Sequence, residues 1–188
     1  MNNQSGKNLI RCFIALELNR ESIEYIRELQ KIIKKKNIFA GKFTEPENLH
    51  LTFKFLGEIS EEKVEEIKKK LSEIKFEKIN VKLGEVGVFS KKALRILWIK
   101  LEGKRIWDLQ KSIDEKMFGL GFEREERFMS HITIARMKKV FDKKIFLDYI
   151  KNIKTKKIIF EVKDFIFKKS ELKSDGPVYT DIERYKLE

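Results

Sequence analysis

The sequence contains one short pattern twice, as His50-Leu51-Thr52-Phe53 and His131-Ile132-Thr133-Ile134, in which histidine and threonine alternate with apolar residues. These are the only two histidines among 188 residues, and the chain has only five threonines. If about 45% of residues are apolar, chance would place this pattern after both histidines about once in 10⁴ to 10⁵ chains. The repetition indicates two related halves that contribute to one site.

Alternation of this kind is typical of β-strands, in which successive side chains point to opposite faces. His50 and Thr52 are therefore expected on one face, and the apolar residues beside them on the face that packs into the core. The same parity places His131 and Thr133 together. The imidazole and hydroxyl of each motif would lie about 6.6 Å apart along the strand, so both can contact one small anion.

Two other interpretations fit a single motif. A partly buried structural histidine beside a β-forming threonine has the same pattern, and two histidines could hold a metal ion. The acidic residues nearest the motifs lie in expected loops or turns, without helical metal-ligand spacing: Glu45, Glu47, Glu58, Glu125 and Glu126. A third ligand is not apparent, so we expect neither a metal nor another cofactor.

The order of predicted elements indicates an α+β fold with antiparallel sheets. Strands are expected at residues 10–18, 50–56, 79–89, 94–101, 131–137, 157–169 and 178–187, with a turn at Gly176-Pro177. Helices are expected after the N-caps Asn19 and Ser60, and over residues 104–118 and 142–153. We predict one domain over residues 1–188, built as two pseudo-symmetric lobes of helix-backed antiparallel sheet with a central cleft.

The net charge of +12 and the pI near 9.6 favour an anionic partner, with nucleic acid first and an anionic membrane surface second. The lysine runs 34–36 and 68–70 fall on polar helix faces, which is more typical of solvated surface. The single cysteine, Cys12, excludes an intrachain disulfide. The absence of a membrane-length apolar run or a signal-peptide core predicts a cytoplasmic protein without a membrane partner.

Three segments carry a family resemblance: residues 12–18 (CFIALEL), 46–57 (PENLHLTFKFLG) and 131–136 (HITIAR). They resemble the two-histidine (2H) phosphoesterases, and more narrowly the bacterial and archaeal RNA 2′,3′-cyclic phosphodiesterases, also called 2′-5′ RNA ligases. Residues 94–99 and 170–179 fit in the same order. One departure is Ser130, because many relatives have proline before the second histidine.

The resemblance implies hydrolysis of an RNA 2′,3′-cyclic phosphate end to a 2′-phosphomonoester, with reversible 2′-5′ ligation as a further activity. It implies His50 as proton donor and His131 as proton acceptor, although the sequence is symmetric on this point. Thr52 and Thr133 would bind the non-bridging phosphate oxygens. RNA with a cyclic phosphate end, such as tRNA fragments, would be the partner of a monomeric enzyme.

Other residues are candidates for the same site. Lys54 shares the strand parity of His50 and is expected to hold phosphate. Arg136 follows the second motif, but strict alternation turns it away from His131, so the strand would have to bend. Lys42 is a weaker phosphate candidate, and Phe128 and Tyr179 are candidates for stacking on a base.

Two competing functions remain at this point. A non-catalytic RNA-binding module would explain the positive charge but not the duplicated motif. A 2H phosphoesterase acting on another phosphodiester would explain both.

Overall fold

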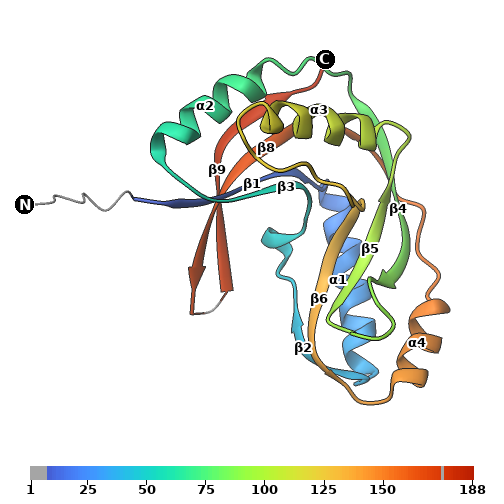
Figure 1. The fold of residues 1–188 in the computed structure, drawn as a ribbon. Coiled ribbons are helices and arrows are strands. Elements are labelled where there is room, and N and C mark those ends of the chain that lie inside the picture. The colour runs from blue at the N-terminus through green and yellow to red at the C-terminus, as the bar shows by residue number, and fades with distance from the viewer. Residues whose placement is uncertain (1–7, 175) are drawn as a thin grey trace, which may run out of the picture.

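A computed structural model describes residues 8–174 and 176–188, and within them the chain forms one curled antiparallel sheet with four α-helices (Figure 1). The strand order is β7-β4-β5-β6-β3-β1-β8-β9, and β2 pairs with β6. The strands are β1 (Ile10–Glu17), β2 (Phe39–Phe43), β3 (His50–Ile59), β4 (Ile79–Val88), β5 (Ile96–Glu102), β6 (His131–Val140), β7 (Ile159–Val162), β8 (Asp164–Lys173) and β9 (Gly176–Lys186).

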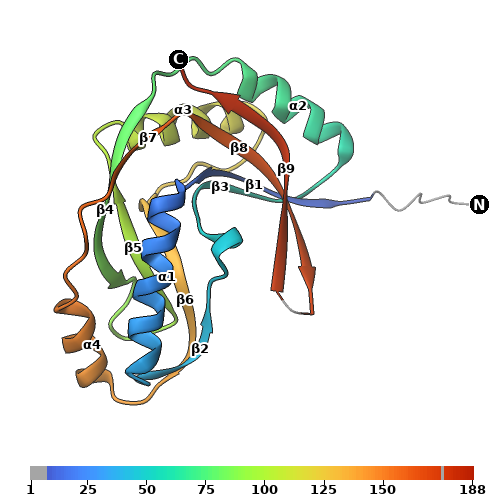
Figure 2. The same ribbon diagram turned by 180° about the vertical axis from the view of Figure 1, so that it is seen from behind.

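The sheet is divided into two lobes, each covered by two helices (Figures 1 and 2). Helices α2 (Glu61–Ser72) and α3 (Ile106–Phe118) lie over β3, β1, β8 and β9, which together form the α2/α3 lobe. Helices α1 (Arg20–Lys35) and α4 (Lys143–Lys151) lie over β2, β6, β5, β4 and β7, which form the α1/α4 lobe. The predicted α+β architecture of two helix-backed antiparallel lobes is confirmed.

The two lobes meet along β3 and β6, where the ladder contains a single residue pair, Leu51 with Ile132. Both side chains are completely buried in the core. Because the register is antiparallel, the two motifs run past each other and then diverge into their own lobes. The two histidine strands are therefore neighbours at the centre of the sheet.

Local sequence explains where most helices begin. The side chains of Asn19, Ser60 and Asp142 accept hydrogen bonds from backbone N–H groups in the first turns of α1, α2 and α4. Each of these helices then turns an apolar stripe toward the sheet, as the 3.6-residue spacing predicts. Helix α3 has no side-chain cap, and its inner face is fully buried.

Two predicted features differ from the structure. Residues 157–169, expected as one strand, are split around Lys163 into β7, which pairs with β4, and β8, which pairs with β1 at the other side of the sheet. Gly176 and Pro177, expected in the turn, already pair with Lys173 and Leu172 as the start of β9. An extended, apolar sequence shows that a segment is a strand but not which strand it pairs with.

Candidate active site

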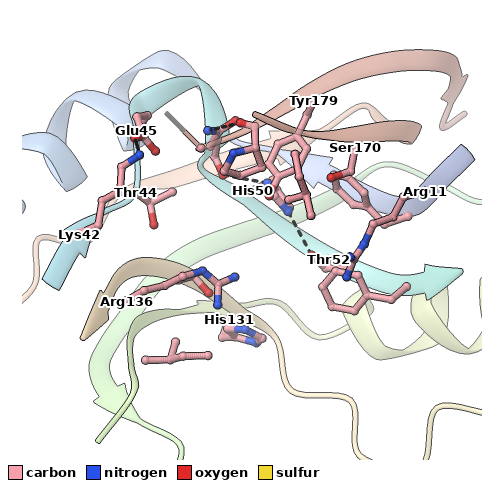
Figure 3. Close-up of a pocket in the computed structure, with 18 of the residues that line it drawn as sticks. Arg11, Lys42, Thr44, Glu45, His50, Thr52, His131, Arg136, Ser170 and Tyr179 are labelled. Atoms are coloured by element: carbon pink, nitrogen blue, oxygen red, sulfur yellow. Dashed lines mark hydrogen bonds and ion pairs between the residues drawn. The ribbon is translucent and has the colours of Figure 1, made fainter. Parts of the chain in front are cut away.

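A cavity of about 640 Å³ lies between the lobes, and its wall contains His50, Thr52 and His131 (Figure 3). Thr133 lines the same cavity. The residues that follow each histidine, Leu51 and Ile132, are buried on the opposite face. The parity argument therefore places both imidazoles and both hydroxyls around one space, where they can contact a single small anion.

Both histidines are held by the same backbone hydrogen bond. The Nδ1 atom of His50 lies 2.8 Å from the carbonyl oxygen of Asn48, and Nδ1 of His131 lies 2.7 Å from that of Met129. A carbonyl only accepts, so Nδ1 carries the proton in both rings, and Nε2 is the nitrogen left for chemistry. Nε2 of His50 lies 3.1 Å from the hydroxyl oxygen of Thr52.

Aromatic side chains lie against the two imidazoles. Phe13 and Tyr179 lie against His50, with ring centroids 5.0 and 5.2 Å away, and Phe89 lies 4.7 Å from His131. Burial lowers the pKa of His50 from 6.5 to about 4, and burial also lowers the pKa of His131. Burial therefore favours the neutral form of both rings in the ligand-free protein.

Arg136 reaches the cavity because β6 contains a β-bulge. Opposite Leu97 of β5, the strand has one extra residue, Ile134, which reverses the alternation of the side chains after it. The guanidinium therefore lies on the same face as His131 (Figure 3). The bulge is the irregularity in the strand that the sequence argument required for Arg136 to reach this face.

A bulge at the equivalent place in β3, where Phe53 is the extra residue opposite β1, has a different consequence. It turns Phe55 into the cavity, at the position that Arg136 occupies in the other lobe. The two halves of the site therefore share their backbone register but differ in chemistry. At this pair of positions, the α1/α4 lobe has a guanidinium and the α2/α3 lobe has an aromatic ring with 68% of its surface exposed.

The predicted position of Lys54 in the cleft is wrong. The same bulge turns this side chain to the other face of β3, where it is 5% exposed. Its Nζ lies 2.5 Å from the carboxylate of Asp114 on α3 and 2.6 Å from the carbonyl oxygen of Glu123. Lys54 therefore binds α3 and the segment leading to His131, and it is too buried to contact phosphate.

Further basic groups line the cavity from both lobes. Arg11 on β1 extends toward Thr52 in Figure 3. Lys42 on β2 pairs in register with Arg136, and its Nζ lies 2.6 Å from the carboxylate of Glu45. Strand β2 can approach β6 this closely because Gly41 has no Cβ to collide with the backbone of Arg136.

The aromatic candidates from the sequence have different positions. Tyr179 is in the cavity wall, whereas Phe128 packs against Phe53 and Trp107 in the α2/α3 lobe. Sequence reasoning missed Arg11, Phe55 and Phe89, since nothing local distinguishes a cavity-lining arginine or phenylalanine from one elsewhere on a strand.

Ser130 fixes the start of β6. Its buried hydroxyl donates to the carbonyl oxygen of Leu101 at 2.5 Å, and the Leu101 N–H donates to the carbonyl oxygen of Ser130.

Within residues 8–174 and 176–188, no three His, Cys, Asp or Glu side chains are grouped as metal ligands. No helix in the same part of the chain is long and apolar enough to cross a membrane.

The two halves of the chain each match one family model, described as LigT like Phosphoesterase, over residues 16–98 and 100–179. The chain belongs to the LigT-like phosphoesterase family. Each match contains one of the two His-x-Thr motifs, in agreement with the pseudo-symmetric register of β3 and β6.

Two archaeal relatives that match this LigT-like phosphoesterase along nearly their whole length have the same name. A protein of Methanocaldococcus jannaschii named RNA 2′,3′-cyclic phosphodiesterase is 35% identical and covers 94% of this chain and 100% of the relative. A protein of the same name from Archaeoglobus fulgidus is 34% identical over 92% of this chain and 98% of its own length. The crystal structure of a Thermus thermophilus protein superposes with a TM-score of 0.80, 26% identity and coverage of 95% and 98%. E. coli LigT has the same fold, with a TM-score of 0.75 and 22% identity over 95% and 98% of the two chains.

Proposed function

We propose that this protein is an RNA 2′,3′-cyclic phosphodiesterase, which opens the cyclic phosphate at an RNA 3′ end and leaves a 2′-phosphomonoester. The observation that carries the proposal is the pair of imidazoles in one cavity, each with Nδ1 bonded to a backbone carbonyl, so that Nε2 is the nitrogen that can exchange a proton. In the ligand-free protein, Nε2 of His50 accepts a hydrogen bond from the hydroxyl of Thr52. The name shared by the archaeal relatives supports the same activity.

Opening the ring requires water to attack phosphorus in line with the departing 3′ oxygen. One group must take a proton from the water, and another must give a proton to the leaving oxygen on the far side of phosphorus. His50 and His131 come from opposite lobes, so each can act at a different oxygen of the same phosphate. Positioned proton transfer of this kind contributes about 10²–10⁴-fold to the rate.

Negative charge on the phosphate would be stabilised from both motifs. The hydroxyls of Thr52 and Thr133 can donate to the non-bridging oxygens, and Arg136 supplies a guanidinium on the His131 side. Arg11 adds a second guanidinium on the His50 side. These donors compensate the charge that develops in the transition state.

The nucleobase would lie beside Phe55, in the half of the site that also contains His50. Phe55 is exposed in the cavity where the pseudo-symmetric position holds Arg136, and Tyr179 is nearby in the wall. A base can stack on an aromatic ring, whereas a phosphate prefers the cation. Stacking of the base on Phe55 would set the direction in which the terminal nucleotide enters.

We assign His50 as the proton donor and His131 as the proton acceptor. Glu17 pairs with His50 across β1 and β3, and its carboxylate raises the pKa of that imidazole. The guanidinium of Arg136 lowers the pKa of His131 and so favours its neutral form. At His50 the ammonium of Lys168, which is ion-paired to Glu17, lowers the pKa by more than Glu17 raises it. The protonated form of His50 therefore requires the anionic substrate, whose charge favours an imidazolium.

The same two groups can catalyse the reverse reaction, in which a 5′-hydroxyl attacks the cyclic end and forms a 2′-5′ bond. Ligation, tRNA fragments as the natural substrates, and action as a monomer in the cytoplasm are further parts of the proposal.

The test is to incubate the protein with a short RNA ending in a 2′,3′-cyclic phosphate, with and without EDTA, and to identify the product by ³¹P NMR. The expected product is a 2′-phosphate at the same rate in both reactions. A 3′-phosphate product, or activity lost on chelation and restored by a divalent ion, would contradict the proposed chemistry. RNA binding without turnover would support the non-catalytic module, and turnover confined to another phosphodiester would support the other competing function.

A further inference from the structure

One extremity of the α1/α4 lobe brings together three segments that are distant in sequence. The end of α1, the end of β6 and the start of α4 lie side by side there (Figures 1 and 2). The N–H of Phe141 donates to the carbonyl oxygen of Ile38, and Phe39 pairs with Val140. We call residues 31–39 and 138–145 the basic tip.

The basic tip contains eight lysines and a single acidic residue. Four of the lysines are in residues 31–36 and four in residues 138–144, and the acid is Asp142, which caps α4. Among the residues that the structure describes, none of these eight lysines has a carboxylate within ion-pair distance. Unpaired like charges at this density repel one another, so an anionic partner would relieve the repulsion.

The other lysine-rich helix has a different environment. On α2, Lys63, Lys68 and Lys70 lie 2.7–3.0 Å from the carboxylates of Glu66, Glu65 and Glu73. The lysine runs 34–36 on α1 and 68–70 on α2 look alike in sequence. Among the described residues, only the run on α1 belongs to a surface whose lysines have no carboxylate within ion-pair distance. Lysines 34–36 are exposed, as expected of a solvated helix face, but unlike the lysines of α2 they lie beside further lysines from another segment.

Apolar side chains are interleaved with the lysines of the tip. Ile32, Phe141 and Ile145 are each more than half exposed there. Single-stranded nucleic acid is bound by this combination, since lysines contact phosphates and an exposed ring offers a stacking surface for a base. An anionic membrane surface is the other partner with this chemistry.

Continuity with the cavity favours RNA. Arg136 lies in the cavity wall on β6, and the exposed residues Lys138 and Lys139 follow on the same strand. From Arg136 to the end of β6 the strand extends about 13 Å, a length that a few nucleotides can span. We propose that the basic tip binds the backbone of single-stranded RNA upstream of the reacting end, so that the RNA leaves the cavity along β6. This inference rests on the proposed function.

The experiment compares two variants with equal loss of charge. The tip variant is Lys138→Gln/Lys139→Gln/Lys143→Gln/Lys144→Gln, and the control, Lys63→Gln/Lys68→Gln/Lys70→Gln/Lys116→Gln, removes lysines that are ion-paired. Each is assayed on a 2′,3′-cyclic mononucleotide and on an RNA of roughly 12 nucleotides with the same end. Thermal unfolding confirms that both variants are folded.

For the longer RNA we expect KM of the tip variant to be about 10-fold or more above that of the wild type. The slope of log affinity against log salt should decrease by about 2, which corresponds to the loss of about three phosphate contacts. For the mononucleotide, both kcat and KM should be unchanged. Equal effects of the two variants on the longer RNA, or an equal effect of the tip variant on both substrates, would overturn the inference.

Two further outcomes separate the inference from the proposed function. If neither substrate is hydrolysed but the tip variant still binds RNA more weakly, the proposed phosphodiesterase function is wrong, whereas the basic tip is supported as an RNA-binding surface. If the tip variant loses binding to phosphatidylserine vesicles while its RNA affinity is unchanged, the surface is a membrane contact and the inference is wrong.

Discussion

Leu51 and Ile132 form the one residue pair that links the two lobes of the sheet in the described part of the chain, and both are completely buried. Each of them stands between the histidine and the threonine of its motif. Continuing the antiparallel register from this pair brings His50 beside Thr133 and His131 beside Thr52. The pair therefore lies on the pseudo-symmetry axis of the site, and it fixes the two imidazoles relative to each other.

This arrangement predicts that neither histidine can replace the other, because acid and base act on opposite sides of phosphorus. His50→Ala and His131→Ala should each lower kcat by about 10²–10⁴-fold. The double variant should be far less than multiplicatively worse, since groups that act as a unit are not additive. Single-turnover kinetics measures the loss, and circular dichroism checks the fold. Near-wild-type turnover in either single variant would exclude the mechanism.

The pH dependence follows from the lowered pKa of both histidines in the free protein. The form with one proton on the pair is populated below pH 6.5, and the second proton binds as the pH falls toward 4. Because both pKa values lie below the ordinary 6.5, we expect kcat/KM to be decreasing already by pH 6.5 and to fall further above it. The kcat profile should lie at higher pH, because the bound anion raises both pKa values. Imidazole NMR of the ligand-free protein provides the direct measurement. A His50 resonance that titrates at 6.5 or above would contradict the expectation.

The chemical difference between Phe55 and Arg136 predicts different kinetic defects at equivalent positions. Phe55→Ala should raise KM by about 5–100-fold with little change in kcat, because base stacking contributes to binding. Arg136→Met should lower kcat as well, because its charge acts on the transition state. A substrate with an abasic 3′-terminal nucleotide is the matched control, and it should be insensitive to Phe55→Ala. An unchanged KM in that variant on normal RNA would remove Phe55 from the site.

Lys54 is expected to affect stability rather than phosphate binding. Lys54→Met leaves Asp114 buried without its cation, which should cost about 3–5 kcal/mol of unfolding free energy. Lys54→Met/Asp114→Leu should recover most of that loss, because no buried charge remains. Some loss should persist, since the carbonyl of Glu123 and the N–H of Glu125 lose their partners. Urea denaturation distinguishes these cases, and a double variant no more stable than Lys54→Met would contradict this explanation.

The sequence by itself determined most of the strands and helices and which residues of each motif share a face. The alternation in the two His-x-Thr motifs depends only on the two-residue period of a strand, so it was sufficient to place His50 with Thr52, and His131 with Thr133, on one face of each strand. The caps of α1, α2 and α4 are likewise local hydrogen bonds, which residue type alone can indicate.

Only the tertiary structure decided the positions of Lys54, Phe55 and Arg136. Each lies beyond a β-bulge, and a bulge depends on how a strand matches its neighbour rather than on the residues of the strand itself. The contrast between the lysines of α1 and those of α2 has a similar cause. Charge is a property of the sequence, but whether a lysine meets a carboxylate or other lysines depends on which segments the fold brings together, because electrostatic interactions act through distance in space.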